Sequence, residues 1–201
     1  MVQTSSRTLA VPKLPVSETV LVLVDFINPL DFPGGDKLAG PAVKAAAKAA
    51  TLKTRLAGKG VPAIYANDNY GVWQSDFHSL VSTCLGMEGP AAEIARILYP
   101  QAQDITILKP RHSAFLGSPL ELLLDGMQAR ELVICGLATD ICVQLTAMDA
   151  FLRDYRVWVP ADCTAAESTR AWKASLDYMA DVLRCDVKPA VPAPRKQRKP
   201  Q

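Results

Sequence analysis

The chain has 201 residues, of which 49% are hydrophobic and 21% are charged, and these values are ordinary for one globular domain. This composition excludes a chain that is disordered throughout, a collagen and a coiled coil. The formal net charge is only +2, so no basic field over the whole chain favours a nucleic-acid partner.

Three further features bear on the class of protein. No run of about 18 apolar residues occurs, so we expect neither a membrane span nor a membrane partner. Residues 1–15 are polar and lack the apolar stretch of a signal peptide, which predicts a cytoplasmic protein. The five cysteines are odd in number, widely spaced and without a CxxC pair, so we expect free thiols rather than disulfides or a cysteine-based zinc site.

Short apolar runs alternate with longer helical patterns along the chain. The β-branched run VLVLVD is typical of a strand buried on both faces, and an Ala- and Lys-rich stretch that stops before two glycines is typical of a helix. Strands are predicted at 20–25, 61–67, 105–109, 132–136, 157–160 and 180–185. Helices are predicted at 41–56, 88–98, 119–127, 140–152 and 167–178.

Strands that alternate with helices of about ten or more residues favour right-handed crossovers and a parallel sheet. The predicted fold class is therefore α/β, a three-layer α/β/α sandwich with a six-stranded parallel sheet. Ligands of such sheets bind at the carboxyl ends of the strands, so the residues that follow each strand are the candidates for a site.

We expect the chain to have three parts. Residues 1–16 are a flexible N-terminal segment, residues 17–186 form one domain, and residues 187–201 are a disordered, Pro-rich tail with five basic residues. The tail either solubilises the protein or anchors it to RNA or an acidic partner, and solubilisation is the simpler reading.

Three residues with charged or reactive side chains lie at predicted strand ends. Asp25 closes the first strand, Lys109 closes the third, and Cys142 follows the fourth across a turn. A carboxylate and an ammonium at the ends of apolar runs each need a partner, and each can serve the other. Because parallel strands end at one edge of a sheet, we expect the three side chains to converge there.

These groups suit acyl transfer through a thioester. With Thr139 or Asp140 as N-cap, Cys142 lies in a first helical turn, where the helix dipole favours thiolate over thiol. Asp25 can take the thiol proton and pass it to a leaving group, while the lysine stabilises both anions. Backbone amides near Ala138 and Cys142 can hold an oxyanion. Taken singly, each of the three side chains can also be structural.

The stretch 132–150, LVICGLATDICVQLTAMDA, resembles the cysteine signature of the isochorismatase-like hydrolase superfamily. This superfamily includes nicotinamidases, N-carbamoylsarcosine amidases, ureidoacrylate amidohydrolases and isochorismatases. The segments VLVDFINPL and ILKPRHSAF resemble its aspartate and lysine motifs and come in the expected order, so the resemblance spans residues 17–185.

The resemblance has consequences for the site and the assembly. It implies a catalytic triad of Asp25, Lys109 and Cys142. It also implies a non-proline cis peptide bond between Leu137 and Ala138, and an oxyanion hole formed by the amides of Ala138 and Cys142. Members have a Rossmann-like sheet of six parallel strands and are usually dimers or tetramers, so a homo-oligomer is expected.

The chain departs from the nicotinamidases in its metal-ligating residues. Nicotinamidases hold a metal with an aspartate and histidines after the second strand. Here only Asp68 and His78 could serve in that region, and His112 is the one other histidine. Two histidines at such a separation do not make a standard zinc set, so we expect no metal and no cofactor.

Residues 67–77 are expected to form a pocket wall around a small planar molecule. The candidate substrate-binding residues are Phe26, Asn67, Asn69, Trp73, His112 and Phe115. The asparagines could bind a substrate carbonyl or carboxylate, and the tryptophan could cover it. Other roles stay open: turn formation for the asparagines, lid or interface packing for the tryptophan, loop capping for the histidine and core packing for Phe115.

The leading hypothesis is a metal-independent cysteine hydrolase that cleaves a small amide or ureido C–N bond through a thioester. One alternative is an isochorismatase-type ether hydrolase that does not need Cys142. The other is a non-catalytic binding or scaffold protein on the same fold. The partner in the leading hypothesis is a small-molecule substrate, which the sequence does not identify.

Overall fold

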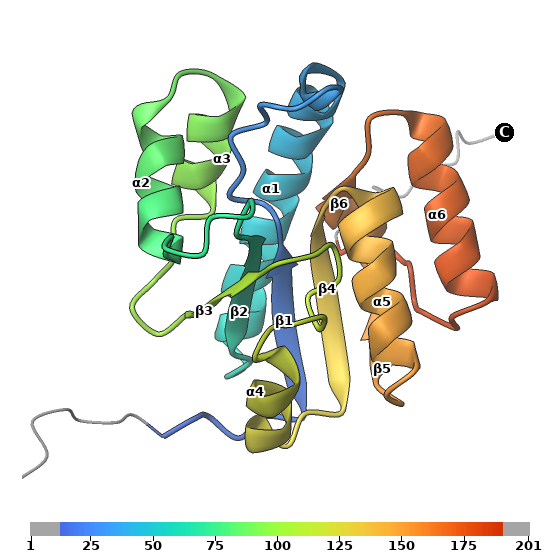
Figure 1. The fold of residues 1–201 in the computed structure, drawn as a ribbon. Coiled ribbons are helices and arrows are strands. Elements are labelled where there is room, and N and C mark those ends of the chain that lie inside the picture. The colour runs from blue at the N-terminus through green and yellow to red at the C-terminus, as the bar shows by residue number, and fades with distance from the viewer. Residues whose placement is uncertain (1–12, 191–201) are drawn as a thin grey trace, which may run out of the picture.

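Figure 1 shows the protein as a computed structural model, in which residues 13–190 are described. The strands are β1 (Thr19–Val24), β2 (Ala63–Asp68), β3 (Ile105–Lys109), β4 (Glu131–Leu137), β5 (Arg156–Trp158) and β6 (Thr164–Ala165). The α-helices are α1 (Gly35–Ala57), α2 (Phe77–Gly86), α3 (Pro90–Ile97), α4 (Leu120–Met127), α5 (Gln144–Phe151) and α6 (Thr169–Asp181). Within residues 13–190, none of the helices has the length and apolar character that a membrane crossing requires.

The strands form one parallel sheet in the order β3-β2-β1-β4-β5. The short strand β6 pairs with the end of β4, whereas β5 pairs with its beginning, so β5 and β6 lie along the same edge of β4. The order along the sheet reverses between β1 and β4. Open α/β sheets bind ligands at such a reversal, beyond the carboxyl ends of the strands.

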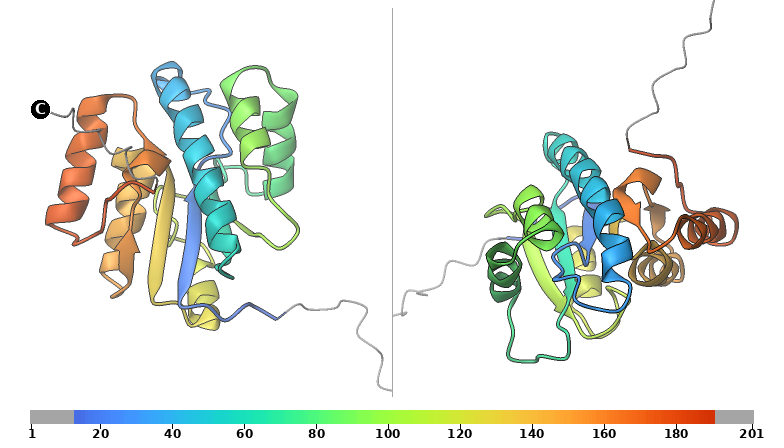
Figure 2. Two further views of the ribbon diagram at one scale, coloured as in Figure 1. Left: turned by 180° about the vertical axis from the view of Figure 1, so that it is seen from behind. Right: turned by 90° about the horizontal axis from the view of Figure 1, so that it is seen from above.

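Helices cover both faces of the sheet, as the two further views show (Figure 2). Leu21 and Leu23 of β1 pack in one core with α1, α2 and α3, and Val20, Val22 and Val24 pack in a second core with α4, α5 and α6. A strand whose side chains alternate between two cores must be apolar at every position, which explains the continuous run in the sequence. The predicted three-layer α/β/α sandwich with six parallel strands is confirmed.

One predicted element is wrong and one helix was not predicted. The sixth strand is predicted at 180–185, but β6 is Thr164–Ala165 and residues 169–181 are helix α6. Beyond that helix, the one bridge to the sheet within residues 13–190 joins Asp186 to Trp158. Helix α2 was not predicted. It begins after Asp76, whose carboxylate accepts from the Ser79 amide, because a short polar side chain at this position satisfies a free N–H of the first turn.

The start of the expected tail is folded onto the domain. The indole of Trp158 donates to the carbonyl of Lys188, and the amide of Ala190 donates to Asp162. Ala190 is buried, and its carbonyl accepts from Arg55. Residues 187–190 therefore belong to the domain, contrary to the predicted boundary at 186. The predictions for residues 1–12 and 191–201 lie outside the described residues.

Candidate active site

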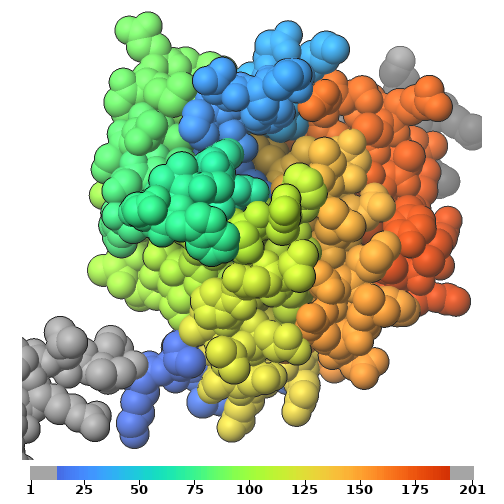
Figure 3. All heavy atoms as spheres, viewed as in Figure 1, coloured from blue at the N-terminus to red at the C-terminus, as the bar shows by residue number. Residues whose placement is uncertain are grey.

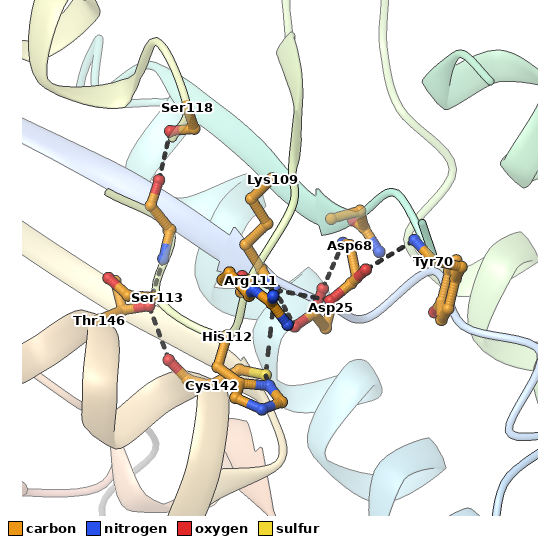
Figure 4. A network of polar contacts seen from close by, with 12 residues as sticks. Asp25, Asp68, Tyr70, Lys109, Arg111, His112, Ser113, Ser118, Cys142 and Thr146 are labelled. Carbon is orange, nitrogen blue, oxygen red and sulfur yellow. Dashed lines mark hydrogen bonds and ion pairs between the residues drawn. The ribbon is translucent and has the colours of Figure 1, made fainter. Parts of the chain in front are cut away.

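Three elements bring the predicted triad together at the carboxyl edge of the sheet. Asp25 directly follows β1, Lys109 is the last residue of β3, and Cys142 lies in a π-helical turn, Thr139–Val143, between β4 and α5. The Lys109 side chain reaches across β2, and its Nζ lies 2.7 Å from Asp25 Oδ2 and 4.0 Å from Cys142 Sγ (Figure 4). The three side chains thus converge, as strand-end positions in a parallel sheet predict.

Asp25 is held in one orientation inside the protein. Its side chain is 5% exposed, and its backbone has a positive φ of 51°. Oδ1 accepts from the backbone amide of Asp68 at 2.7 Å, while Oδ2 binds the Lys109 ammonium. Burial raises the pKa of this carboxyl above its ordinary value, although Lys109 opposes the shift. Asp25 is therefore a stronger proton acceptor than an exposed aspartate.

Lys109 is a fully buried cation with several oxygen partners. Besides Asp25, its Nζ donates to the carbonyl of Arg111 at 3.0 Å and lies 3.7 Å from Asp68 Oδ2. A buried ammonium is costly unless it is paired and hydrogen-bonded, and this set of oxygens meets that need.

The surroundings of Cys142 favour the neutral thiol. Burial and the nearby Asp25 carboxylate, which is within hydrogen-bonding reach of the sulfur, raise the thiol pKa; Lys109 opposes them more weakly. These effects act against the thiolate that the predicted helix N-terminus would favour. The local helix cap is also not the one predicted, because the turn begins after Ala138 without a side-chain cap from Thr139 or Asp140.

The turn before Cys142 contains an unusual peptide bond. The bond between Leu137 and Ala138 is cis. The carbonyl of Ala138 accepts from the amides of Ile141 and Val143, each at 3.2 Å. These two bonds fix the backbone on which Cys142 lies.

A cleft of about 350 Å³ lies beside the triad and is visible as a hollow in the space-filling view (Figure 3). Its lining residues are Asp68, Asn69, Gly71, Trp73, Pro110, Arg111 and His112. The loop after β2 is shaped by two side chains that accept backbone amides: Asp68 from Tyr70 at 2.6 Å and Asn69 from Gly71 at 2.9 Å. These turns present the exposed Trp73 at the rim.

Half of the six candidate substrate-binding residues line this cleft, namely Asn69, Trp73 and His112. The other half lie in the interior and offer no surface to a substrate in this structure. Phe26 is fully buried in the core, and the Asn67 amide donates to the carbonyl of Ile27 at 2.7 Å, which ties the loop after β1 to β2. Phe115 packs between Tyr155 and the guanidinium of Arg153.

Sequence reasoning missed the contribution of Asp68 to the triad. Asp68 was considered only as a metal ligand, yet its amide holds Asp25 and its carboxylate lies near Lys109. Its position at a strand end could have indicated this role: Asp68 is the last residue of β2 and is paired with Lys109 of β3 in the sheet. Within residues 13–190, no three His, Cys, Asp or Glu side chains are grouped as a metal site would require.

Comparison with known proteins assigns the family. The Isochorismatase domain family model matches residues 19–186. An uncharacterized isochorismatase family protein, YaaI of Bacillus subtilis, is 34% identical over 171 residues, which are 85% of this chain and 93% of that protein. The ureidoacrylate amidohydrolase RutB of Azorhizobium caulinodans is 30% identical over 70% of this chain and 73% of its own.

Solved structures share the fold. An N-carbamoylsarcosine amidase from Thermoplasma acidophilum superposes with a TM-score of 0.65 and 28% identity, over 86% of this chain and 96% of the other. The nicotinamidase SaPncA of Staphylococcus aureus superposes with a TM-score of 0.67 at 22% identity, over 88% and 100% of the two chains. The chain belongs to the isochorismatase family.

Proposed function

We propose that this isochorismatase-family hydrolase cleaves a C–N bond of a small amide or ureido compound, with Cys142 as the nucleophile. The observation that carries the proposal is the contact set of Asp25, Lys109 and Cys142: a buried base, a buried cation and a partly accessible thiol next to one cleft. The relatives named as amidohydrolase and amidase support the same bond type.

The first half-reaction forms a thioester. As Cys142 Sγ attacks the substrate carbonyl carbon, the thiol proton moves to Asp25, so that no free thiolate need accumulate. The amides of Ala138 and Cys142 hold the oxyanion of the tetrahedral intermediate. When the C–N bond breaks, Asp25 returns the proton to the leaving nitrogen, and an amine or ammonia departs.

The second half-reaction regenerates the enzyme. Water gives a proton to Asp25 and attacks the thioester carbonyl, and the C–S bond then breaks. The proton on Asp25 returns to the sulfur, which restores the neutral thiol. Lys109 stays protonated throughout and stabilises the negative charge as it passes between carboxylate and sulfur.

The raised pKa of the Cys142 thiol agrees with this scheme. A nucleophile that is neutral at rest needs a base in contact with it, and Asp25 is within hydrogen-bonding reach of the sulfur. No step calls for a metal or an organic cofactor. We also propose that the protein acts in the cytoplasm as a dimer or tetramer, which light scattering would test.

The test compares wild type with Cys142→Ala and Asp25→Asn in the hydrolysis of ureidoacrylate and N-carbamoylsarcosine, measured as ammonia release. Circular dichroism establishes that each variant is folded. Activity that disappears in both variants supports the proposal. If Asp25→Asn is inactive but Cys142→Ala turns over at the wild-type rate, the reaction does not use the cysteine, and the proposed thioester mechanism is contradicted.

A further inference from the structure

A second side chain, with a ring N–H, lies beside the nucleophile, in addition to Lys109. His112 Nδ1 lies 3.7 Å from Cys142 Sγ, which is closer than the 4.0 Å separating the sulfur from Lys109 Nζ. The imidazole is exposed to solvent and lines the cleft beside the triad. Figure 4 shows the ring beside the sulfur, on a different side from Lys109 and Asp25.

The hydrogen bonds of Lys109 explain why a second donor matters. Its Nζ already serves Asp25 Oδ2 at 2.7 Å and the Arg111 carbonyl at 3.0 Å. Its third N–H can reach Cys142 Sγ only at the longer distance of 4.0 Å, so the lysine stabilises the sulfur anion mainly by its charge and donates a weak hydrogen bond to it. A sulfur that gains negative charge needs hydrogen bonds that were absent from the resting thiol. Of the described side chains, His112 is placed to supply one.

We propose that His112 is a further catalytic residue, whose Nδ1–H donates a hydrogen bond to Cys142 Sγ as negative charge develops there. The inference rests on the proposed function, because it assigns His112 a part in that same reaction. The Nδ1 proton is present in the imidazolium and in one neutral tautomer, and either form can donate it to the sulfur.

The charged groups near the ring come from five segments of the chain. Asp25 and Lys109 lie behind the sulfur, Asp68 lines the same cleft, and Arg111 precedes His112 on its own loop. Asp149 of α5 lines a second hollow that His112 also borders. The ring therefore has both negative carboxylates and positive side chains near it. The group that it contacts through Nδ1 is the Cys142 sulfur.

The chain allows a controlled test because it has only two histidines. His112→Asn places an amide N–H donor near the position of Nδ1, and His112→Phe keeps a ring without a hydrogen bond. His78→Asn is the matched control away from the sulfur. The readout is the rate of Cys142 alkylation by iodoacetamide at one fixed pH, mapped by peptide mass. This readout needs no substrate.

His112→Phe should slow alkylation of Cys142 by roughly tenfold, the scale of one hydrogen bond to a charged group. His112→Asn should retain most of the wild-type rate because its amide restores a donor, and His78→Asn should match wild type. A His112→Phe rate that coincides with that of His78→Asn would overturn the inference, as would a His112→Asn rate as low as that of His112→Phe. Because Cys142→Ala hydrolysis tests the proposed function separately, either claim can fail alone.

Discussion

At the scale of single residues, the site depends on a buried ion pair. Lys109 is fully buried and Asp25 nearly so, and their 2.7 Å contact is embedded among further polar groups. Removal of one partner of a buried pair leaves the other charge without compensation, and the loss of stability then exceeds the value of an exposed pair. The pair therefore supports the fold and the chemistry together.

The first prediction concerns Lys109→Gln. The variant should lose about 3 kcal/mol of unfolding free energy near neutral pH, because Asp25 remains buried and ionised without its cation. Lys109 lowers the pKa of Asp25 against burial, so the folded-state pKa of Asp25 rises further in the variant. An ionised group whose folded-state pKa is raised destabilises the fold, so the deficit should shrink as the pH falls through that pKa.

Urea unfolding at several pH values measures this effect. Arg156→Gln serves as the control, since Arg156 pairs with Glu18 at 2.8 Å on the open surface, and it should show no measurable change in stability. A Lys109→Gln deficit that grows toward low pH would contradict the sign of the argument.

The second prediction concerns the pH dependence of turnover. Asp25 must be ionised to accept the thiol proton, and burial raises its pKa above the ordinary 3.8. The acid limb of kcat/KM should therefore lie above that value, with activity lost as the pH falls through the raised pKa. An acid limb at or below the ordinary aspartate range would show that another group acts as the base.

At the scale of elements, the close approach of β1 and β4 sets the position of the cis peptide and the turn carrying Cys142. Gly136 pairs with Val24 in the sheet and has a φ of 155°. A Cβ built on Gly136 would lie 2.2 Å from the carbonyl oxygen of Val24, which is backbone and cannot rotate away. Only glycine fits at this point without separating the two strands.

The third prediction follows from that approach. Gly136→Ala should destabilise the protein by about 1–3 kcal/mol and slow Cys142 alkylation, because β4 must shift just before the turn. Gly86→Ala is the control: it is the exposed last residue of α2 with nothing within 4 Å of a built Cβ, and helix propensity should make it neutral or stabilising. Equal unfolding free energies for the two variants would contradict the account.

At the scale of the whole molecule, the domain extends past the boundary that its composition suggested. Lys188 and Ala190 make hydrogen bonds to Trp158, Asp162 and Arg55. The fourth prediction compares a chain ending at residue 190 with one ending at 186. The shorter chain should be less stable by about 1–3 kcal/mol, as judged by urea unfolding, because it loses these bonds. Equal stability would show that residues 187–190 contribute nothing.

The sequence predicted most of the fold because five strands are apolar runs with recognisable ends. Strand β6 has only two residues and carries no periodic signal, so its place depends on pairing with β4. The triad could be predicted because strand ends converge in a parallel sheet. The sequence could not predict which neighbours of the triad face the cleft. Phe26 and Asn67 lie one or two positions from a strand end, yet their side chains are buried in the packed layers.

The raised pKa of the Cys142 thiol could not be predicted for a similar reason. The sequence places the cysteine after a turn, where a helix dipole would act on it. Burial and contact with Asp25 arise only when β1, β3 and β4 come together, and they shift the pKa in the opposite direction. Local sequence therefore located the cysteine, while tertiary packing sets the direction of its pKa shift.

The central claim is that Cys142 becomes acylated, and trapping the acyl-enzyme tests it most directly. Wild-type protein is mixed with ureidoacrylate, or with any amide that it is found to hydrolyse, quenched in acid within the first turnover and digested for peptide mass analysis. The account predicts an added acyl mass on the Cys142 peptide that is absent from Cys142→Ala, which should release no ammonia. Hydrolysis by Cys142→Ala at the wild-type rate, with no adduct on the wild-type cysteine, would contradict it.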